Sequence, residues 1–338
     1  MVGPEPMKFE ICEHPGKEWD QFVEKHTHIL FYYSVWSEVL QEGLGGRPYY
    51  LCLKNDAGIA CGMPGVMLTY YGIRLFYSSI PYGGYIGDPA LFGRFMSRFR
   101  EETKIADIVH VSPFLSDRDE EYSRFFTSAG EAATRIDLKG KTGEDVFSRF
   151  EPSVRQSLNK SARLGVEVVR CDDRESFLTA HRLYLQTMER NRAIARYTEK
   201  WFGALHLILA GKGLAFVCLA RYNGTPVSAT VVIDSGKGYH LLHSGSCTEQ
   251  LNLRANDVIV CELLKDAIRE GKESVDFMFS DPLDTNLIRW KEKFGGSTSM
   301  LNKYSWINSP LKFALWNSAK RVYPLLHRFR KNVARSQS

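Results

Sequence analysis

The sequence lacks any long apolar run, since no stretch approaches the ~18 consecutive apolar residues of a membrane-spanning helix. Its first 19 residues show no basic segment followed by an apolar one, so we expect no secretion signal. Hydrophobic residues make up 44% and charged residues 25% of the chain, which excludes extended disorder and collagen-like repeats. We therefore expect a folded, cytoplasmic protein, and 338 residues favour two domains over one.

Signatures of metal sites and disulfides are also missing. The seven cysteines are odd in number and include no CxxC pair, so we expect them to be reduced and mostly buried. The nine histidines form no HExxH motif. His240 and His243 lie three apart in an expected strand, and we predict that they point to opposite faces. We predict neither a metal site nor a cofactor.

Acidic residues are absent from the end of the chain. The last 46 residues contain none, but they carry nine basic residues: Lys293, Lys303, Lys312, Lys320, Arg321, Arg328, Arg330, Lys331 and Arg335. Removing these nine charges from the net charge of +5 leaves −4 on residues 1–292. Any partner that binds through these positive charges is therefore expected to contact the C-terminal segment.

The chain contains an internal repeat. At an offset of 166 residues, and without gaps, residues 50–53 align with residues 216–219. Other positions keep the same register over about 75 residues: Trp36 with Phe202, Gly58 with Gly224, Leu75 with Leu241, Ser78 with Ser244, and Val109 with Val275. An offset close to half the chain length indicates two tandem copies of one domain.

Each copy shows the same order of elements. We expect helices at 18–26, 34–43 and 90–103, repeated at 174–190, 198–210 and 256–270. We expect strands at 48–54, 59–69, 73–80 and 107–112, repeated at 214–221, 226–234, 237–246 and 274–279. Asn256 is the expected N-cap of its helix, and Gly271 its stop signal. The order resembles the GNAT-type N-acetyltransferase fold, present twice.

The expected boundary lies near residues 140–152, which are rich in glycine and charge. We predict a first domain over residues 1–145, a second over 146–309, and a basic tail over 310–338. Ser153 is expected to cap a helix that ends at Gly165. The cations of that helix are either a solvated face or an anion-binding site: Arg155, Lys160 and Arg163.

The glycine loop of acyl-CoA-dependent members of this superfamily is missing. That loop, Q/R-x-x-G-x-G/A, lets backbone amides reach the cofactor pyrophosphate at a helix N-terminus. The corresponding residues, 252–257, contain no glycine, and Asp257 places a negative charge there. We therefore predict that CoA binding at this helix is disfavoured.

Four segments resemble the Fem-type aminoacyl transferases, tandem acetyltransferase-fold proteins that include enzymes adding amino acids from aminoacyl-tRNA to peptidoglycan precursors. The segments are Arg-x-x-x-x-Lys-x-x-Arg-x-Gly at 155–165, residues 252–257, Asp-Phe at 276–277 and Trp-Lys-Glu-Lys-Phe-Gly-Gly at 290–296. The resemblance covers residues from about 15 to 310. It implies an α/β fold of two tandem GNAT-like domains with mixed sheets.

The resemblance also implies site residues. Lys291 matches a family lysine near the reacting ester, where a cation would stabilise an oxyanion, and Phe294 belongs to the same motif as a substrate-binding candidate. In the alternative interpretation, Lys291 and Lys293 are solvated charges. Arg190, Arg192 and Arg196 match family arginines for a phosphate-bearing acceptor, although their spacing does not put all three on one helical face.

Residues 82–88 resemble a glycine-rich family segment that ends in an acidic residue. Asp88 is the candidate base or amine-orienting group, and Tyr82 and Tyr85 are candidate substrate contacts. The alternative for Asp88 is a turn residue before Pro89. The long coiled-coil arm of some Fem-type enzymes is missing, which removes one feature that supports tRNA binding without excluding it.

The tail combines apolar residues with cations. Leu311, Leu315 and Trp316 alternate with basic residues, a pattern that suits an anionic membrane surface. The alternative is a terminal helix packed on the first domain. For residues 310–322 the two interpretations stand equal, and for residues beyond Pro324 the membrane interpretation is favoured.

Taken together, these features predict a Fem-like aminoacyl or acyl transferase that acts on an amine of a cell-envelope precursor or peptide. Aminoacyl-tRNA is the expected donor, and the protein is expected to be cytoplasmic or peripheral at the inner face of the membrane. Two alternatives stay open: an acyl-CoA-dependent N-acyltransferase of polysaccharide or lipid biosynthesis, and a non-catalytic membrane-surface scaffold.

Overall fold

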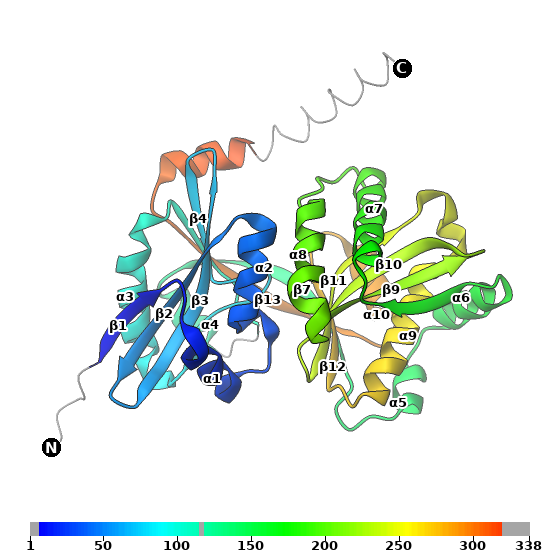
Figure 1. Cartoon of the computed structure of the whole chain (residues 1–338), viewed down its shortest axis with the longest axis horizontal. Helices are drawn as coiled ribbons and strands as arrows, with labels where there is room; N and C mark the ends of the chain where they lie inside the picture. The colour runs from blue at the N-terminus through cyan, green and yellow to red at the C-terminus, as the bar shows by residue number, and fades with distance from the viewer. Residues whose placement is uncertain (1–6, 115–117, 320–338) are drawn as a thin grey trace, which may run out of the picture.

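The computed structural model describes residues 7–114 and 118–319. Two α/β halves lie side by side and share one continuous sheet (Figure 1). In this part of the chain no helix has both the length and the apolar composition that crossing a bilayer requires. The seven cysteines are all free, as the sequence predicts.

The first half contains six long strands, a short one and four α-helices among the described residues. In chain order these are β1 (Lys8–Cys12), α1 (Gly16–His26), α2 (Ser34–Leu44), β2 (Arg47–Asn55), β3 (Gly58–Tyr70), β4 (Ile73–Tyr77), β5 (Ile86–Gly87), α3 (Phe92–Glu102), β6 (Ile108–Val111), α4 (Asp119–Ser123) and β7 (Thr127–Asp137).

The second half repeats this order after a short insertion. Its elements are α5 (Gly143–Phe147), α6 (Pro152–Arg163), β8 (Glu167–Cys171), α7 (Arg174–Arg190), α8 (Glu199–Leu209), β9 (Ala215–Tyr222), β10 (Thr225–Asp234), β11 (Gly238–Ser246), α9 (Ala255–Arg269), β12 (Ser274–Ser280), α10 (Thr285–Glu292) and β13 (Ser297–Ile307). The predicted tandem α/β organisation is confirmed, and every predicted helix and strand overlaps an observed one.

The two halves exchange their last strands. The strand order is β1-β2-β3-β4-β6-β13-β7-β12-β11-β10-β9-β8. Strand β13, from the end of the second half, pairs with β6 of the first, whereas β7 of the first half pairs with β12 of the second. Strands β7 and β13 pair with each other over nine residue pairs, so the sheet runs through the junction without an edge.

This exchange bears on the domain boundary. Strand β7 ends at Asp137 and α5 begins at Gly143, so we propose that the connection between them divides the halves, slightly before the expected residue 145. The sheet crosses that division, because each half needs a strand from the other to complete its pairing.

Helices α2 and α8, which occupy equivalent positions in the repeat, pack against each other between the halves (Figure 1). The rings of Trp36 and Trp201 meet edge to face at 5.9 Å. A Cβ at Gly43 would lie 2.7 Å from the Trp201 ring, so only glycine permits this approach of the two helices. The largest buried apolar cluster therefore contains side chains from both halves.

Three details of the sequence analysis are wrong. Ser153 is not the N-cap of α6, because Glu151 has that position and Pro152 begins the helix. His240 and His243 lie on the same face of β11, because the pairing with β10 shifts by one residue between them and the bulge cancels the alternation. His240 contacts Phe31 and His243 accepts a hydrogen bond from Trp201, both members of the cluster between the halves. Asn256 is not the N-cap of α9, since Arg254 has that position and the Asn256 side chain accepts from Ser228.

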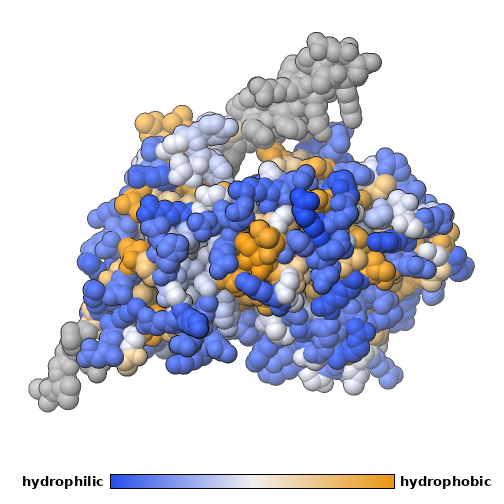
Figure 2. Space-filling model, viewed as in Figure 1, coloured by the Kyte–Doolittle hydropathy of each residue, from blue (hydrophilic) through white to orange (hydrophobic). Residues whose placement is uncertain are grey.

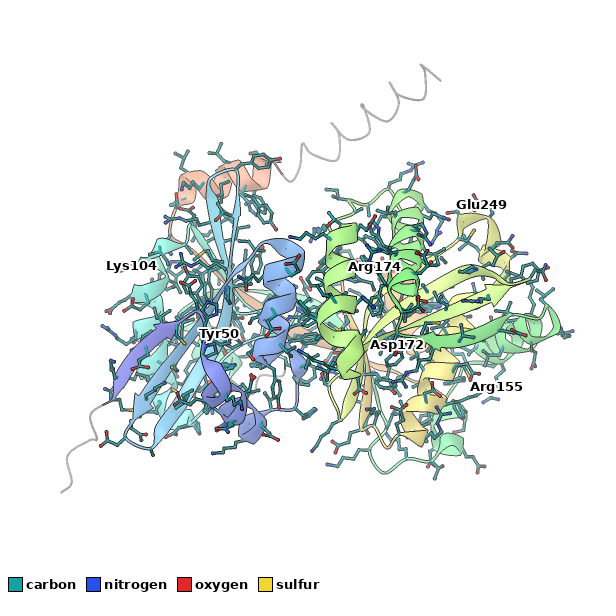
Figure 3. The ribbon with its side chains drawn as sticks, in the orientation of Figure 1. Tyr50, Lys104, Arg155, Asp172, Arg174 and Glu249 are labelled. Carbon is teal, nitrogen blue, oxygen red and sulfur yellow. The ribbon has the colours of Figure 1, made fainter. Side chains whose placement is uncertain are left out.

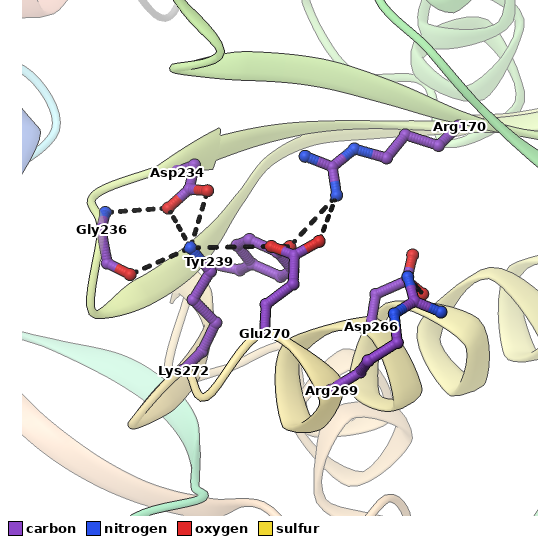
Figure 4. A network of polar contacts seen from close by, with 8 residues as sticks. All are labelled: Arg170, Asp234, Gly236, Tyr239, Asp266, Arg269, Glu270 and Lys272. Carbon is purple, nitrogen blue, oxygen red and sulfur yellow. Dashed lines mark hydrogen bonds and ion pairs between the residues drawn. The ribbon is translucent and has the colours of Figure 1, made fainter.

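The β10–β11 turn of the second half is held by a network of charges (Figure 4). The Lys272 ammonium lies 2.8 Å from both carboxylate oxygens of Asp234 and donates to the Gly236 carbonyl. The Glu270 carboxylate accepts from Arg170 and from the Tyr239 hydroxyl. Because these groups satisfy one another, the network ties the β10–β11 turn to α9 and needs no ligand.

Residues 310–319 form a helix that packs on the first half (Figure 1). Phe313 and Trp316 cover Ile73, Leu75 and Ile108. The packed-helix alternative therefore holds for this segment. Residues 320–338, to which the rest of the membrane-tail prediction applies, lie outside the described residues.

Candidate functional site

Strand β12 carries a buried acid at the place where the halves join. Asp276 is fully buried and pairs across the sheet with Arg135 of β7. Immediately after it the register shifts, and Met278 takes a positive φ of 60°. This bulge turns the carbonyls of residues 277–279 away from the ladder. The strand thus presents an acid and a set of unpaired acceptors at one point.

Asp276 collects donors from both halves. The hydroxyl of Tyr82, from the first half, donates to its Oδ2 at 2.9 Å, and Nδ1 of His240 lies 3.1 Å from the same oxygen. The Arg135 guanidinium is 3.7 Å away, and the Met278 amide donates to Oδ1. We call Tyr82, Arg135, His240, Asp276 and Lys291 the junction cluster.

The electrostatics of the junction cluster keep Asp276 ionised. Burial alone raises the pKa of a carboxyl, but the hydrogen bond and charge of His240, the charge of Arg135 and the Met278 amide together bring the pKa of Asp276 below its ordinary value. Among the described residues, Nε2 of His240 and Nε of Arg135 are buried without a hydrogen-bond partner. Such atoms are uncommon in folded proteins and mark a place where a polar group of a substrate fits.

Lys291 is buried beside this acid and is not a solvated charge. Its ammonium donates to the carbonyls of Phe277 at 2.7 Å and Met278 at 3.1 Å, and reaches that of Phe279 only at 3.5 Å. Burial lowers its pKa to about 8, against the opposing charges of Asp276 and Asp284. The third contact is at the long limit of a hydrogen bond, so the ammonium is held mainly by the Phe277 and Met278 carbonyls.

Lys293 is also buried, and for a different reason. Its ammonium lies 2.8 Å from Oδ2 of Asp257, which is 1% exposed in the first turn of α9. Asp257 further accepts from the Trp290 indole at 2.9 Å and pairs with Arg254 at 3.2 Å. The acid that the sequence places at this helix N-terminus is therefore neutralised by the chain itself.

Among the predicted site residues, the structure brings Tyr82 and Lys291 together, through Asp276. The glycines that follow Tyr82 are required locally, since a Cβ at Gly83 would lie 1.4 Å from the Ser78 carbonyl oxygen. Tyr85 and Asp88 lie elsewhere: the Tyr85 ring packs on Phe92 and Phe95 in the core of the first half.

Asp88 is exposed and takes the turn role that the sequence left open. Its carboxylate caps the short helix at Pro89–Leu91 by accepting from the Ala90 amide at 2.9 Å. No contact between Asp88 and the junction cluster exists among the described residues. Its position does not support a part as base.

The three arginines predicted for a phosphate-bearing acceptor differ in their surroundings. The Arg190 guanidinium donates hydrogen bonds to Ser246, Thr248 and Thr187. These bonds anchor α7 to the end of β11, so the side chain is engaged within the protein and not by a phosphate. Arg192 and Arg196 are exposed in the loop after α7. Arg196 lies close enough to Tyr77 of the first half to lower the pKa of that hydroxyl, although burial raises it overall.

Phe294 is a core residue and does not face a substrate. It is fully buried and stacks against Phe277, Trp290 and Phe150. Gly295 follows it with φ of 80°, and a Cβ there would also press on Arg149. The motif at 290–296 therefore closes α10 onto the second half, while its lysines point to Asp257 and to the bulge of β12.

The helix with the cations Arg155, Lys160 and Arg163 lies at the outer side of the second half, where Figure 3 labels Arg155. Arg155 donates to the Ser148 carbonyl at 3.0 Å and Arg163 to that of Asn159. These contacts support the solvated-face interpretation. In the described part of the chain, no group of His, Cys, Asp and Glu side chains is arranged to hold a metal ion.

The sequence analysis missed His240, Arg135 and the role of Asp276. A usable signal was present: His240 and Asp276 each interrupt an apolar strand that is covered on both sides, where an ionisable side chain is rare unless it is paired. Two such interruptions in neighbouring strands indicate a buried polar pair.

Comparisons with known proteins agree with this architecture. Residues 148–292 match the family model of the acetyltransferase (GNAT) domain. The crystal structure of FemX superimposes with a TM-score of 0.69 at 16% identity, covering 89% of this chain and 98% of that one. The chain has a Fem-like tandem GNAT fold. The domain match also gives its activity class, an acyltransferase.

Two further solved structures share the fold of this Fem-like chain. A tandem GNAT protein from the clavulanic acid biosynthesis pathway has a TM-score of 0.58 at 10% identity, over 90% of this chain and 99% of that one. The C-terminal domain of a putative lysylphosphatidylglycerol synthetase from Agrobacterium fabrum has a TM-score of 0.55 at 13% identity, over 90% and 96%. No curated protein matches the sequence.

Proposed function

We propose that this acyltransferase moves an amino acid from aminoacyl-tRNA to an amine of a cell-envelope precursor or peptide. The observation that carries the proposal is the state of the α9 N-terminus. Asp257 fills its first turn and is bound by Lys293, Arg254 and Trp290. A CoA pyrophosphate needs free backbone amides at such a terminus, and residues 252–257 lack the glycines that let a pyrophosphate approach them.

The junction cluster supplies groups suited to the chemistry. The attacking amine forms a bond to the ester carbonyl carbon, and the carbonyl oxygen becomes an oxyanion. The carbonyl then re-forms as the ester C–O bond breaks, and the proton lost by the amine passes by way of a base to the leaving ribose oxygen of the tRNA. The Lys291 ammonium is placed to stabilise the oxyanion. Because Asp276 holds Nδ1 of His240, the unpartnered Nε2 is the atom that accepts the proton.

The acceptor and donor contacts are proposed from the loop after α7. Arg192 and Arg196 are exposed, and Arg196 lies near Tyr77 across the junction of the halves. Two guanidinium groups in this position suit a phosphate-bearing acceptor or the phosphates of a tRNA end. FemX and the lysylphosphatidylglycerol synthetase share the fold, which supports an aminoacyl donor and an envelope acceptor for this chain.

The decisive experiment is mass spectrometry of envelope precursors from cells with and without the protein. We expect precursors that differ by the mass of one amino-acid residue, and that mass names the group transferred. Purified protein should then transfer the same amino acid from charged tRNA to the purified acceptor. Identical precursor profiles, together with no transfer in vitro, would contradict the proposal.

The second candidate is an acyl-CoA-dependent N-acyltransferase, which is favoured by the match of residues 148–292 to an acetyltransferase domain. We expect acetyl-CoA binding to be undetectable or in the millimolar range, no stronger than ~4 kcal/mol. Isothermal titration calorimetry checks this, with a CoA-dependent GNAT enzyme as positive control. Micromolar affinity would replace the aminoacyl proposal by this second candidate. A non-catalytic scaffold, in turn, would keep its function after loss of Lys291.

A further inference from the structure

The helix at residues 310–319 is apolar on its exposed side as well as on its packed side, where Phe313 and Trp316 lie. Its single charged side chain, Lys312, turns inward and lies 3.0 Å from a carboxylate oxygen of Asp107. The outward positions carry no charge at all: Pro310, Leu311, Ala314, Leu315, Ser318 and Ala319. A helix that lies on a protein surface normally presents its polar side to water. This outward set, which we call the outer face, is therefore apolar without a partner in the described chain.

A second apolar element lies beside the outer face. Tyr71, at the tip of the β3–β4 hairpin, is fully exposed. The hairpin is tied to the helix, since Tyr70 stacks on Trp316 at 5.7 Å and Lys312 donates to the Gly72 carbonyl. With Leu311 and Leu315 exposed by 73% and 56%, the tip and the helix present one apolar surface. Figure 2 shows hydrophobic atoms over this helix at the upper end of the first half.

The chain that continues from this helix is strongly basic. Residues 320–338 contain six lysines and arginines and no acidic residue. They follow the outer face directly in the sequence. An apolar face flanked by cations has the composition of a segment that binds an anionic lipid surface.

We propose that the outer face and Tyr71 dock on an anionic membrane surface, with Leu311 and Leu315 inserted at the level of the lipid headgroups. Nucleic acid fits less well, because the outer face has no cation to pair with phosphates. The inference does not depend on the aminoacyl proposal, since it concerns no residue of the junction cluster. Truncation of the whole tail is an unsuitable test, because Phe313 and Trp316 cover Ile73 and Leu75.

The test uses the full chain and vesicles of phosphatidylcholine with and without phosphatidylglycerol, measured by co-sedimentation. Leu311→Ser, Leu315→Ser and Tyr71→Ser together should lower the vesicle-binding constant at least about tenfold at every salt concentration. The matched control changes three exposed apolar residues of the second half, Leu185→Ser, Leu207→Ser and Leu251→Ser, and should bind as the original chain does. Near-ultraviolet circular dichroism verifies that both triple variants are folded.

A third variant separates the tail from the face. Arg328→Gln, Arg330→Gln and Lys331→Gln should weaken binding at low salt only, because surface charges are screened as salt rises. The proposal is overturned if the face variant binds as well as the control, or if the original chain ignores anionic vesicles at low salt. It is also overturned if the chain self-associates without lipid and the face variant is monomeric in the ultracentrifuge, since the face is then an interface between copies.

Discussion

Replacing Lys293 by methionine is expected to lower the free energy of unfolding by about 3–5 kcal/mol. Lys293 and Asp257 are both nearly inaccessible and form a 2.8 Å ion pair. Removing the lysine leaves a carboxylate buried in the first turn of α9 with Trp290 and the partly exposed Arg254 as its remaining partners. Urea unfolding followed by fluorescence and circular dichroism gives the difference in stability.

The matched control is Lys303→Met. Lys303 also pairs with a carboxylate, Glu131, at 2.7 Å, but about a third of each side chain is exposed. We expect this variant to lose no more than about 1 kcal/mol, the usual value of a solvated pair. Adding Asp257→Asn to the Lys293→Met variant should restore part of the lost stability, because the unpaired charge is gone. Equal stabilities of the two lysine variants would return Lys293 to the solvated-charge interpretation.

This outcome bears on what a sequence pattern can predict. The local elements follow from periodicity and turn chemistry. The repeat at offset 166 and the strand ranges expected in each copy correctly placed β9, β10 and their counterparts β2 and β3. Gly271 ends α9 with φ of 70°, as its position after the last helical turn predicts. These features depend on local patterns in the chain, so they can be predicted from a single sequence.

The strand exchange depends on non-local pairing. Apolar and polar side chains do not alternate strongly enough in residues 127–137 or 297–307 to predict a strand, and neither central strand was predicted. Their partners lie far away in the chain: β7 faces β12, and β13 faces β6. The choice between pairing within a half and pairing across halves is made by the whole sheet. A local pattern therefore cannot reveal it.

The candidate site also contains residues that the sequence singled out and residues whose contacts depend on distant parts of the chain. The family resemblance singled out Lys291 and Tyr82, and the structure brings both to Asp276. Phe294 and Arg190 were predicted as substrate contacts. In the structure Phe294 packs against Phe150 and Arg190 donates to Ser246, contacts with elements distant in sequence that a local pattern does not show. His240 and Lys293 were missed for a similar reason: one is set by a bulge, the other by a buried acid 36 residues away.

The largest kinetic effect is expected for Lys291→Met. If the ammonium stabilises charge that develops only during attack, its loss should slow the single-turnover transfer step by roughly a hundred- to a thousandfold, or ~2.7–4 kcal/mol. Acceptor binding should change little, because the interaction is stronger in the transition state than in the ground state. Single-turnover rates and acceptor affinities, measured with the donor that mass spectrometry identifies, test both parts.

Lys272→Met is the control that separates chemistry from packing. Like Lys291, Lys272 is a nearly inaccessible lysine held by short hydrogen bonds, but it lies in the network of the β10–β11 turn, which contains no residue of the junction cluster (Figure 4). We expect both variants to lose stability, and only Lys291→Met to lose transfer rate. Equal rates of the two variants at temperatures where both are folded would show that Lys291 serves packing alone.

The pH dependence of the transfer rate distinguishes a charge on Lys291 that acts in the reaction from a side chain that serves packing alone. The pKa of Lys291 is lowered to about 8 by burial, so its cationic form prevails below that pH and is lost above it. The ratio of the original rate to the Lys291→Met rate should therefore be largest below pH 8 and should fall toward one as the pH rises through that value. Taking the ratio cancels the ionisation of the attacking amine, which affects both proteins equally. A ratio that stays constant across this range would mean that the positive charge of Lys291 does not act in the transfer step.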